Sequence, residues 1–481
     1  MFPSSLDLLR IAPELVLSAA GVLIMLFDPF AINGSVRGSG RRLADVIAIL
    51  GAAGACAAIV LPATHQGPAF GGLLSIDPFG IFFRAIVCGV ALLIALGAPA
   101  YLDGEGLAHG EFLALVLFAS VGMCVMASAN ELVTGFVALE VSSIASYILA
   151  SYRRENKRSN EAAMKYFLLG SFASAFFLYG IALVYGATGS TVLPQVNFAV
   201  ANHMLLTVGL ALIFVGLGFK VAAAPFQLWT PDVYEGAPAP VTAMMSTAPK
   251  AAAFALLLRI FLSLERANEL WFWILWASAV ATMFIGNLAA IAQFSVKRML
   301  AYSSIAHAGY ILVAFAARNH IGTAAVLFYL ASYALMKVGA FTMVAWLGGT
   351  DERYVTLDDY AGLASARPIS AACLSLFLLS LLGLPVTAGF LGKFYIFDAA
   401  LRSHLVWLAV LLAINSVIGS FYYLRVIVAM YMRPAKREFT PESVPAGIAA
   451  VLAISAAGII YLGLFPNIVM GFAAHAATFF K

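Results

Sequence analysis

The sequence predicts an all-α protein that crosses a membrane many times, and three observations lead to this prediction. Hydrophobic residues make up 63% of the 481 residues, and charged residues only 10%. The mean hydropathy is +0.97. Long apolar runs follow one another along the whole chain. A soluble domain is about half apolar and about a quarter charged, so these few charges cannot cover a water-exposed surface. We therefore expect one membrane domain over residues 1–481.

The apolar runs predict helices rather than barrel strands. A spanning helix needs about 20 mostly apolar residues, whereas a barrel strand shows alternation over about ten residues, which is absent here. The longest weakly apolar stretch, 348–368, is a short loop, so no soluble catalytic domain is expected. The sequence predicts about fourteen spans, at 11–29, 43–62, 76–100, 111–128, 131–151, 160–186, 203–228, 239–262, 270–290, 299–318, 321–347, 369–397, 404–431 and 446–466.

The loop cations predict the orientation, because short cytoplasmic loops carry an excess of Lys and Arg. Alternate loops on one side hold fourteen cations, and those on the other side hold five. The richer side is expected to be cytoplasmic, and an even number of spans then places both termini on the opposite side. The richer set is Arg37, Arg41, Arg42, Arg153, Arg154, Lys157, Arg158, Lys297, Arg298, Arg353, Arg367, Arg433, Lys436 and Arg437; the poorer set is Arg10, Arg266, Arg318, Arg402 and Lys481.

No cofactor or nucleic-acid motif is visible. The four cysteines lie far apart in apolar runs, without CxxC or Cys/His spacing, so neither zinc nor an iron–sulfur cluster is expected on this chain. Neither a GxGxxG nor a P-loop pattern occurs. The net charge of +4 is spread out, without a basic run that would favour nucleic acid. The chemistry is therefore expected inside the membrane or through partner proteins.

Eight Lys or Arg residues fall within the predicted spans, where each charge at the bilayer centre costs about 2.5–3.5 kcal/mol. Lys165, Arg259 and Arg425 lie near span ends and are expected to reach the interface with their long side chains. Arg84 lies deeper, and two interpretations stay open for it, a structural role or a pair with a carboxylate. The other four are Lys220, Lys250, Lys337 and Lys393.

These four lysines predict a proton or ion path rather than structural pairing. Lys250 and Lys337 lie near the middle of their spans, as does the carboxylate Glu140. His307 lies nine residues into span ten, and its near-neutral titration suits a relay. Burial disfavours the charged form of a lysine and a nearby carboxylate favours it, so a moving carboxylate would switch the lysine between holding and releasing a proton. Waters would have to bridge the sites.

Two of the lysines lie in spans that look broken. Span seven has Pro225 close to Lys220, and span twelve has Pro385 close to Lys393, each among several glycines. Broken helices line cavities in membrane proteins, and paired breaks mark transporter sites. The two spans are five apart, which predicts two inverted five-helix units at 111–262 and 270–431. Residues 1–110 then hold helices one to three, and 446–466 hold the last helix.

Several stretches are similar to a known family. "FKVAAAPFQLWTPDVYEGAPAPVTAMMSTAPKAAAF" (219–254) resembles the signature of the antiporter-like membrane subunits of respiratory complex I. The segments "KRMLAYSSIAHAGY" (297–310) and "GLPVTAGFLGKFYIF" (383–397) are also similar to that family. Residues 139–190, which begin "LEVSSIASYILASYRRENKRSNEAAMKYF", are similar to that family as well. The resemblance covers nearly the whole chain and is strongest to the N-chain branch.

The resemblance implies a fold of fourteen helices with an inverted five-helix repeat and breaks in helices seven and twelve. It implies a hydrated proton axis through Glu140, Lys220, Lys250 and Lys393; His307 and Lys337 are assigned to the same relay. It implies that NADH, FMN, iron–sulfur clusters and quinone bind to other subunits of the complex, with no redox centre on this chain. The expected partners are the other membrane subunits, including neighbouring antiporter-like ones, in a bacterial inner membrane. The alternative is a cation/proton antiporter subunit of the Mrp type.

Overall fold

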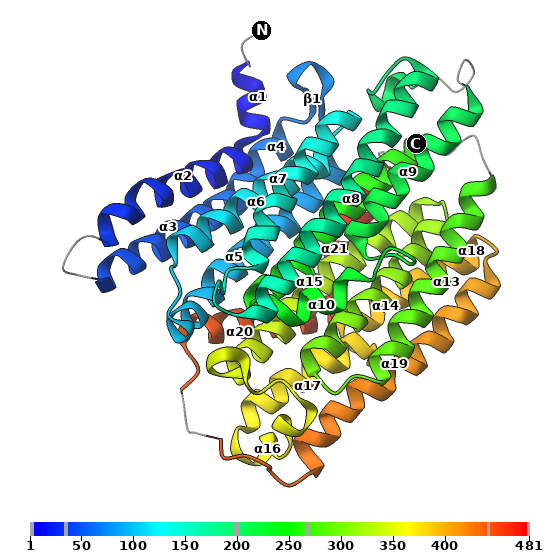
Figure 1. The fold of residues 1–481 in the computed structure, drawn as a ribbon. Helices are drawn as coiled ribbons and strands as arrows, with labels where there is room; N and C mark the ends of the chain where they lie inside the picture. Colours follow the sequence, from blue (N-terminus) through cyan, green and yellow to red (C-terminus); the bar gives the residue numbers. More distant parts are fainter. Residues whose placement is uncertain (1–3, 33–36, 197–201, 265–268, 440–442, 479–481) are drawn as a thin grey trace.

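The fold is a single slanted bundle of helices, as seen in a computed structural model of the chain (Figure 1). The structure describes residues 4–32, 37–196, 202–264, 269–439 and 443–478. In these residues, twelve helices are long and apolar enough to cross a membrane, judged by length and composition. One small antiparallel hairpin, β1 (Gly67–Ala69) with β2 (Leu74–Ile76), lies at one end of the bundle. The prediction of an all-α membrane protein is confirmed.

The first half of the chain supplies the helices at one edge of the bundle, beginning with α2 and α3 (Figure 1). Its helices are α1 (Ser5–Arg10), α2 (Ala12–Ile32), α3 (Arg37–Ala58), α4 (Val60–Thr64), α5 (Pro78–Glu105), α6 (Gly110–Ser128), α7 (Leu132–Ala150), α8 (Lys157–Thr188), α9 (His203–Val221), α10 (Trp229–Gly236), α11 (Ala239–Met245) and α12 (Ala248–Leu264).

The second half supplies the opposite edge, where α13, α18 and α19 lie (Figure 1). Its helices are α13 (Glu269–Ile291), α14 (Val296–Ala316), α15 (His320–Gly348), α16 (Leu363–Ala366), α17 (Pro368–Leu382), α18 (Ala388–Arg402), α19 (Val406–Met432), α20 (Ala446–Leu464) and α21 (Asn467–Ala477), with the short turns η4 (Thr350–Glu352) and η5 (Leu357–Tyr360) between α15 and α16. The hairpin and α21 have no counterpart among the predicted spans.

Two of the fourteen predicted spans are not among the twelve long helices. The span at 11–29 corresponds to α2, whose side chains are described as far as Asp28. The span at 369–397 is divided into α17 and α18, of 15 residues each. The predicted break in span twelve is therefore confirmed. So is the break in span seven, where α9 ends at Val221 and α10 begins at Trp229.

A third break was not predicted. The span at 239–262 is divided at Ser246 and Thr247 into α11 and α12. Pro249 has no N–H to donate to the carbonyl of Met245, four residues earlier. The Tyr234 hydroxyl donates to that carbonyl instead, at 3.0 Å. In a membrane interior such a substitute partner is needed, because water is not available to satisfy the backbone.

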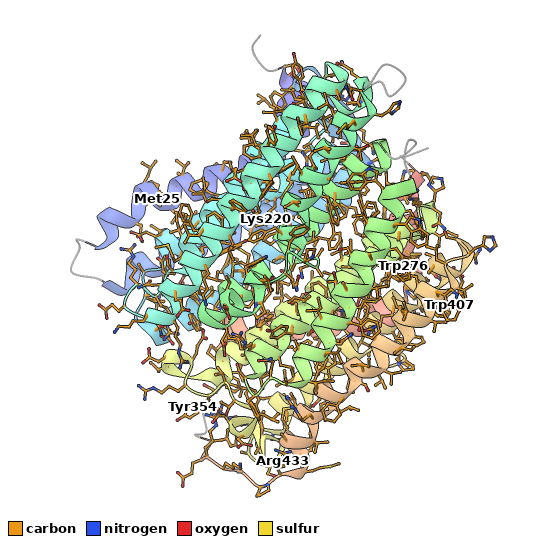
Figure 2. The ribbon with its side chains drawn as sticks, turned by 45° about the vertical axis from the view of Figure 1, so that its right-hand side comes forward. Met25, Lys220, Trp276, Tyr354, Trp407 and Arg433 are labelled. Carbon is orange, nitrogen blue, oxygen red and sulfur yellow. The ribbon has the colours of Figure 1, made fainter. Side chains whose placement is uncertain are left out.

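The outer surface of the bundle is apolar, as a lipid-facing surface must be. Figure 2 shows Met25 and Trp407 on opposite outer edges and Lys220 in the interior. Trp407 is 76% exposed. Contact with lipid or with a partner protein makes such exposure of a large apolar side chain favourable. Arg433 and Tyr354 lie at one end of the bundle, where the cation-rich loops gather (Figure 2). Two cations used for the orientation, Arg266 and Lys481, lie outside the described residues.

Two buried ion pairs hold the first helices in place. Arg84 on α5 pairs with Glu14 on α2 at 2.8 Å, which decides between its two interpretations in favour of a carboxylate partner. Arg259 on α12 makes hydrogen bonds of 2.7 and 2.9 Å to the two carboxylate oxygens of Asp77. The prediction that Arg259 reaches the interface is therefore wrong. Asp77 caps the start of α5, so the pair ties α12 to that helix end instead.

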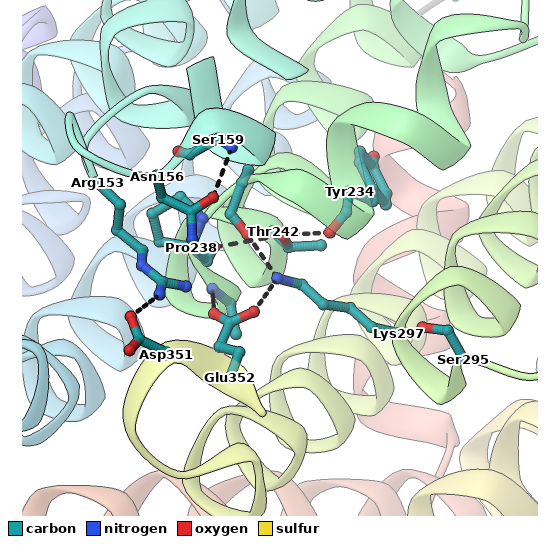
Figure 3. Close-up of polar contacts among 12 residues, drawn as sticks. Arg153, Asn156, Ser159, Tyr234, Pro238, Thr242, Ser295, Lys297, Asp351 and Glu352 are labelled. Atoms are coloured by element: carbon teal, nitrogen blue, oxygen red, sulfur yellow. Dashed lines mark hydrogen bonds and ion pairs between the residues drawn. The ribbon is translucent and has the colours of Figure 1, made fainter. Parts of the chain in front are cut away.

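A buried polar cluster gathers around Glu352, in the turn that follows α15 (Figure 3). Its carboxylate accepts hydrogen bonds from the Tyr101 hydroxyl at 2.7 Å and from the backbone N–H of Ala239 at 2.8 Å. Lys297, at the start of α14, forms an ion pair with it at 2.5 Å. The cluster thus fixes the first residue of α11, the helix that leads into the break before Lys250.

A second ion pair lies beside this cluster. Arg153, in the loop after α7, pairs with Asp351 at 2.8 Å (Figure 3). It also pairs with Glu105 at 3.3 Å. Together the two clusters fasten the turn after α15 to the loop between α7 and α8. They join the first and second halves of the chain at the end of the bundle that carries the cation-rich loops.

Candidate functional site

One face of α14 organises the interior of the second half. Ser303, Ser304 and His307 follow one another at helical spacing, and Leu300 and Tyr310 extend the same strip by one turn each way. All five are buried. Lysines from three other helices, α12, α15 and α18, reach this strip. The polar residues of "LAYSSIAHAGY" therefore form a continuous line inside the membrane domain.

Lys250 lies two residues after the start of α12 and reaches the middle of the strip. Its Nζ donates to the carbonyl oxygen of Ser304 at 2.7 Å. It also lies over the ring of Tyr333, 5.8 Å from the centroid, and the Tyr333 hydroxyl donates to the hydroxyl of Ser304 at 2.8 Å. The break before Pro249 brings this lysine into the core at a helix start rather than in the middle of a continuous helix.

Lys337 on α15 reaches the strip one turn away. Its Nζ donates to the carbonyl oxygen of Leu300 at 2.7 Å and to the hydroxyl of Ser303 at 2.9 Å. Its side chain has no exposed surface. Lys250 and Lys337 thus bind to adjacent serines of the same helix.

His307 lies between two tyrosine hydroxyls. Its Nδ1 is 2.5 Å from the hydroxyl of Tyr329 on α15, and its Nε2 is 3.0 Å from the hydroxyl of Tyr423 on α19. A neutral imidazole donates at one ring nitrogen and accepts at the other, so both hydroxyls can be satisfied at once. The histidine is therefore held in a polar position suited to accepting and passing on a proton.

Lys393 lies at the break between α17 and α18. Its Nζ donates to the carbonyl oxygen of Leu382, the last residue of α17, at 2.8 Å, and to the hydroxyl of Ser416 at 2.9 Å. It also lies over the ring of Tyr310, 5.0 Å from the centroid. Gly383 ends α17 with φ 94°, a conformation that glycine adopts without strain, and its Cα faces the lysine side chain. The break supplies both the space and the carbonyl that the lysine binds.

Lys220 lies in the last turn of α9, where a cation is favoured by the helix dipole. The chain beyond it is held by side chains that satisfy the broken backbone. Trp229 Nε1 donates to the carbonyl oxygen of Phe219 at 2.9 Å, while Thr282 Oγ1 accepts from the N–H of Ala224 at 2.8 Å. Ser278 donates to the carbonyl oxygen of Ala224 at 2.8 Å. This break is therefore an ordered part of the core.

Glu140 and Lys220 do not form an ion pair. Glu140 accepts a short hydrogen bond from Ser174 on α8, while Lys220 donates to the hydroxyl of Tyr147 at 3.2 Å. Tyr147 lies seven residues after Glu140 on α7, on the same face and about 10 Å along the axis. Glu140, the partner expected for Lys220, thus lies on the same helix as Tyr147. It is two turns away from the Tyr147 hydroxyl that the lysine contacts.

A glycine on α8 makes room for this tyrosine, and its replacement gives a first prediction. A Cβ added at Gly170 would lie 2.1 Å from the Tyr147 hydroxyl oxygen. Gly170→Ala should therefore displace that hydroxyl from Lys220 and lower proton translocation per assembled complex several-fold. The matched control is Gly186→Ala on the same helix, where a Cβ would meet nothing within 4 Å. Equal rates for the two variants would show that the Tyr147 contact is dispensable.

The four lysines share an electrostatic property. All four are buried: Lys220 and Lys393 are 9% exposed, Lys250 is 1% exposed and Lys337 is 0% exposed. The neighbouring His307 is 1% exposed. Their Nζ atoms contact carbonyl oxygens, hydroxyls and ring faces, and in the described part of the chain they form no ion pair with a carboxylate. An unpaired buried charge is costly, so these ammonium groups are not held by structural pairing. The arrangement can instead exchange protons.

Asp232 stands apart from this set. It lies in the first turn of α10, bound to Lys165 and Arg298 at 2.8 Å each. Burial raises the pKa of its carboxyl, but the hydrogen bonds from these two cations outweigh burial and hold the pKa below its usual range. The carboxylate therefore stays charged and fastens α8, α10 and α14 near the loops.

The neutral members of the site were missed by sequence reasoning. Tyr147, Tyr329, Tyr333 and Tyr423 bind the lysines and the histidine, yet mid-span tyrosines are common and carry no charge signal. One signal was present: Ser303 and Ser304 lie four and three residues before His307, and this spacing puts all three on one helix face.

Fold and site together define an all-α membrane protein of the antiporter-like class. Residues 129–419 match the family model described as NADH:quinone oxidoreductase/Mrp antiporter, TM. A chain of respiratory complex I from Thermus thermophilus, in a structure with bound aureothin, has a TM-score of 0.82 at 38% identity, with 96% of this chain and 99% of that chain covered.

A curated relative gives the particular family. NADH-quinone oxidoreductase subunit N 1 of Solibacter usitatus (strain Ellin6076) is 48% identical over 482 residues, which cover 99% of this chain and 98% of the relative. This chain belongs to the NADH-quinone oxidoreductase subunit N family. A chain of the Mrp complex from Dietzia sp. DQ12-45-1b has a TM-score of 0.86 at 23% identity, with 99% of this chain and 97% of that chain covered, and this shows the shared fold alone.

Proposed function

We propose that this chain translocates protons as a membrane subunit of an NADH-quinone oxidoreductase. Membership of the subunit N family, at 48% identity over almost the whole chain, supports this function. The observation that carries the site assignment is the set of buried lysines without carboxylate partners, three of which meet one polar face of α14. A structural role would favour paired charges, whereas proton exchange favours unpaired ones.

The proposed path has two parts joined at Lys250. In the first part, Glu140 lies on α7 and Lys220 on α9, with the Tyr147 hydroxyl of α7 bound to the lysine. In the second part, Lys337, His307 and Lys393 follow the strip of α14. Within the described residues no hydrogen bond joins Lys220 to Lys250, so we assign that step to bridging water. The parts fall within the predicted five-helix repeats at 111–262 and 270–431, a division that stays a prediction.

A change of charge at one position drives the step at the next. Protonation of Glu140 removes a negative charge near Lys220, which favours release of the lysine's proton toward Lys250. Arrival of a positive charge at Lys250 in turn favours proton movement away from the neighbouring groups on α14. Each group therefore acts both as a proton carrier and as a switch for its neighbours.

The redox chemistry is proposed to lie in partner subunits. NADH, FMN, iron–sulfur clusters and quinone would bind there, and this chain would use the energy of their reaction. Its partners would be the other membrane subunits of complex I, with neighbouring antiporter-like subunits among them. The location is the bacterial inner membrane, and we propose that both termini face the periplasm because the opposite loops hold most of the cations.

The test of this function uses Lys220→Ala and Glu140→Ala in the whole complex. We expect each complex to assemble and proton translocation per NADH oxidised to fall. The initial rate should be at least about tenfold lower, because a proton-exchanging group is lost. Translocation is measured in inside-out membrane vesicles supplied with NADH. Lys165→Ala is the control, since that lysine is bound to Asp232 near the loops. If an assembled Lys220→Ala complex still translocated the wild-type number of protons per NADH, the assignment of Lys220 to the proton path would be wrong.

The Mrp-type antiporter is the second candidate, favoured by the shared fold and by a family model that covers both groups. It predicts sodium or potassium exchange for protons in vesicles that hold the chain but receive neither NADH nor quinone. The 48% identity to subunit N, against 23% to the Mrp chain, favours the quinone reductase. Cation exchange that persists without these substrates would reverse the order of the two candidates.

A further inference from the structure

Two buried hydroxyls connect Lys337 to His307. Lys337 Nζ donates to Ser303 Oγ at 2.9 Å, and Ser303 Oγ is 2.5 Å from the hydroxyl oxygen of Tyr423. That same hydroxyl is 3.0 Å from His307 Nε2. The three contacts run from an ammonium group to an imidazole without interruption, although their residues come from α14, α15 and α19.

The direction of these hydrogen bonds follows from the chemistry of the groups. A protonated lysine only donates, so Ser303 accepts from it and has its own hydrogen free for Tyr423. Tyr423 then accepts from the serine and donates to His307 Nε2. The other imidazole nitrogen, Nδ1, donates to the Tyr329 hydroxyl in that tautomer. Each hydrogen bond in the line then has one donor and one acceptor, and the line has one direction.

The protein holds both hydroxyls firmly in this place. Ser303 and Tyr423 are buried, with 0% and 1% of their surface exposed. The Tyr423 ring packs against the ring of Tyr422, with centroids 4.4 Å apart. Because the hydroxyls are shielded from bulk water, a proton that moves along them cannot be lost to solvent on the way.

We propose that Ser303 and Tyr423 are relay residues that carry a proton between Lys337 and His307. This inference rests on the proposed function of the chain. Lys337 gives a proton to Ser303 Oγ, the serine hydrogen passes to Tyr423, and the phenol hydrogen passes to His307 Nε2. The ammonium becomes an amine and the imidazole becomes an imidazolium, while both hydroxyls end neutral. Their hydrogens then point the other way, so both must turn before the next proton in the same direction.

A purely structural role for the two hydroxyls would lead to a different result. If they only satisfied each other, their loss would lower stability without altering the rate in complexes that still assemble. A relay through two hydroxyls has several hydrogens in motion in one step, so its rate is sensitive to deuterium. The solvent isotope effect on translocation therefore separates the two roles.

The decisive experiment compares Tyr423→Phe with Tyr360→Phe in the whole complex. Both tyrosines are buried, but Tyr360 lies in η5, and its hydroxyl has no hydrogen-bond partner in the described part of the chain. We expect Tyr423→Phe to slow NADH-driven proton translocation in vesicles at least about tenfold per assembled complex and to change its solvent deuterium isotope effect. Tyr360→Phe should leave both quantities near the wild-type values. Equal rates and isotope effects for the two variants would overturn the proposal.

A second pair of variants applies if Tyr423→Phe does not assemble. Ser303→Ala interrupts the same line at another atom. Ser332→Ala is its control, since among the described residues the Ser332 hydroxyl donates to the Phe328 carbonyl of its own helix. Slow translocation in Ser303→Ala alone supports the relay, and equal rates contradict it. If Lys220→Ala slows translocation but the relay variants do not, the relay is wrong and the proposed function stands. If none of these variants slows translocation, the proposed function fails as well.

Discussion

Replacing Lys250 by methionine is expected to lower NADH-driven proton translocation about a hundredfold while the complex still assembles. Loss of a proton-exchanging group from a transfer step typically changes its rate by about 10²–10⁴-fold. Lys250 is buried at the junction of the two parts of the proposed path, where its Nζ contacts the Ser304 carbonyl. Methionine has a similar length and removes a buried charge, so the fold should tolerate it. The measurement is the initial rate of proton translocation in vesicles, per assembled complex.

Lys250→Arg separates proton exchange from charge alone. Arginine keeps a positive charge and can donate to the Ser304 carbonyl, but it does not release its proton in proteins. If Lys250 exchanges protons, the arginine variant should be as slow as the methionine variant. If the lysine only supplies a charge that binds the α14 backbone, arginine should restore most of the rate. Recovery of translocation in Lys250→Arg would contradict the proposed role.

Glu14→Leu is expected to have the largest effect on stability. The change leaves Arg84 buried with one remaining partner, the carbonyl oxygen of Arg10 at 3.0 Å. Breaking a buried ion pair by removing one partner costs about 3–5 kcal/mol. A guanidinium cannot lose its charge, whereas a stranded carboxylate can take up a proton. Glu14→Leu should therefore be more damaging than Arg84→Leu. The amount of assembled complex and its dissociation temperature are the measurements.

The double variant Glu14→Leu/Arg84→Met provides the control. Replacing both members of a buried pair by apolar residues of similar size is often neutral or stabilising. We expect the double variant to recover most of the assembled complex that Glu14→Leu loses. Failure of this recovery would mean that the pair is needed for more than charge compensation. If Arg84→Leu were the more damaging of the two single variants, the argument from the fixed charge of arginine would be wrong.

The sequence alone determined the class of fold and the charged part of the site. Composition requires a membrane protein, because 10% charged residues cannot cover a soluble surface. Pro225 and Pro385 marked two breaks that the structure contains. The buried cations Lys220, Lys250 and Lys393 were visible because a charge in lipid is too costly to be incidental. Each of these signals is local, since it depends on a residue and its immediate neighbours.

The tertiary structure alone decided which neutral groups complete the site. The break before Lys250 was missed because Pro249 reads as an ordinary interruption of an apolar run, and only the Tyr234 hydroxyl shows how the freed carbonyl is satisfied. Arg259 was expected at the interface, yet Asp77, 182 residues away, binds it. Hydroxyls such as that of Tyr423 carry no charge penalty, so their burial leaves no mark in the sequence. Contacts between distant segments depend on how helices pack, and that packing is what places the tyrosines and serines between the charges.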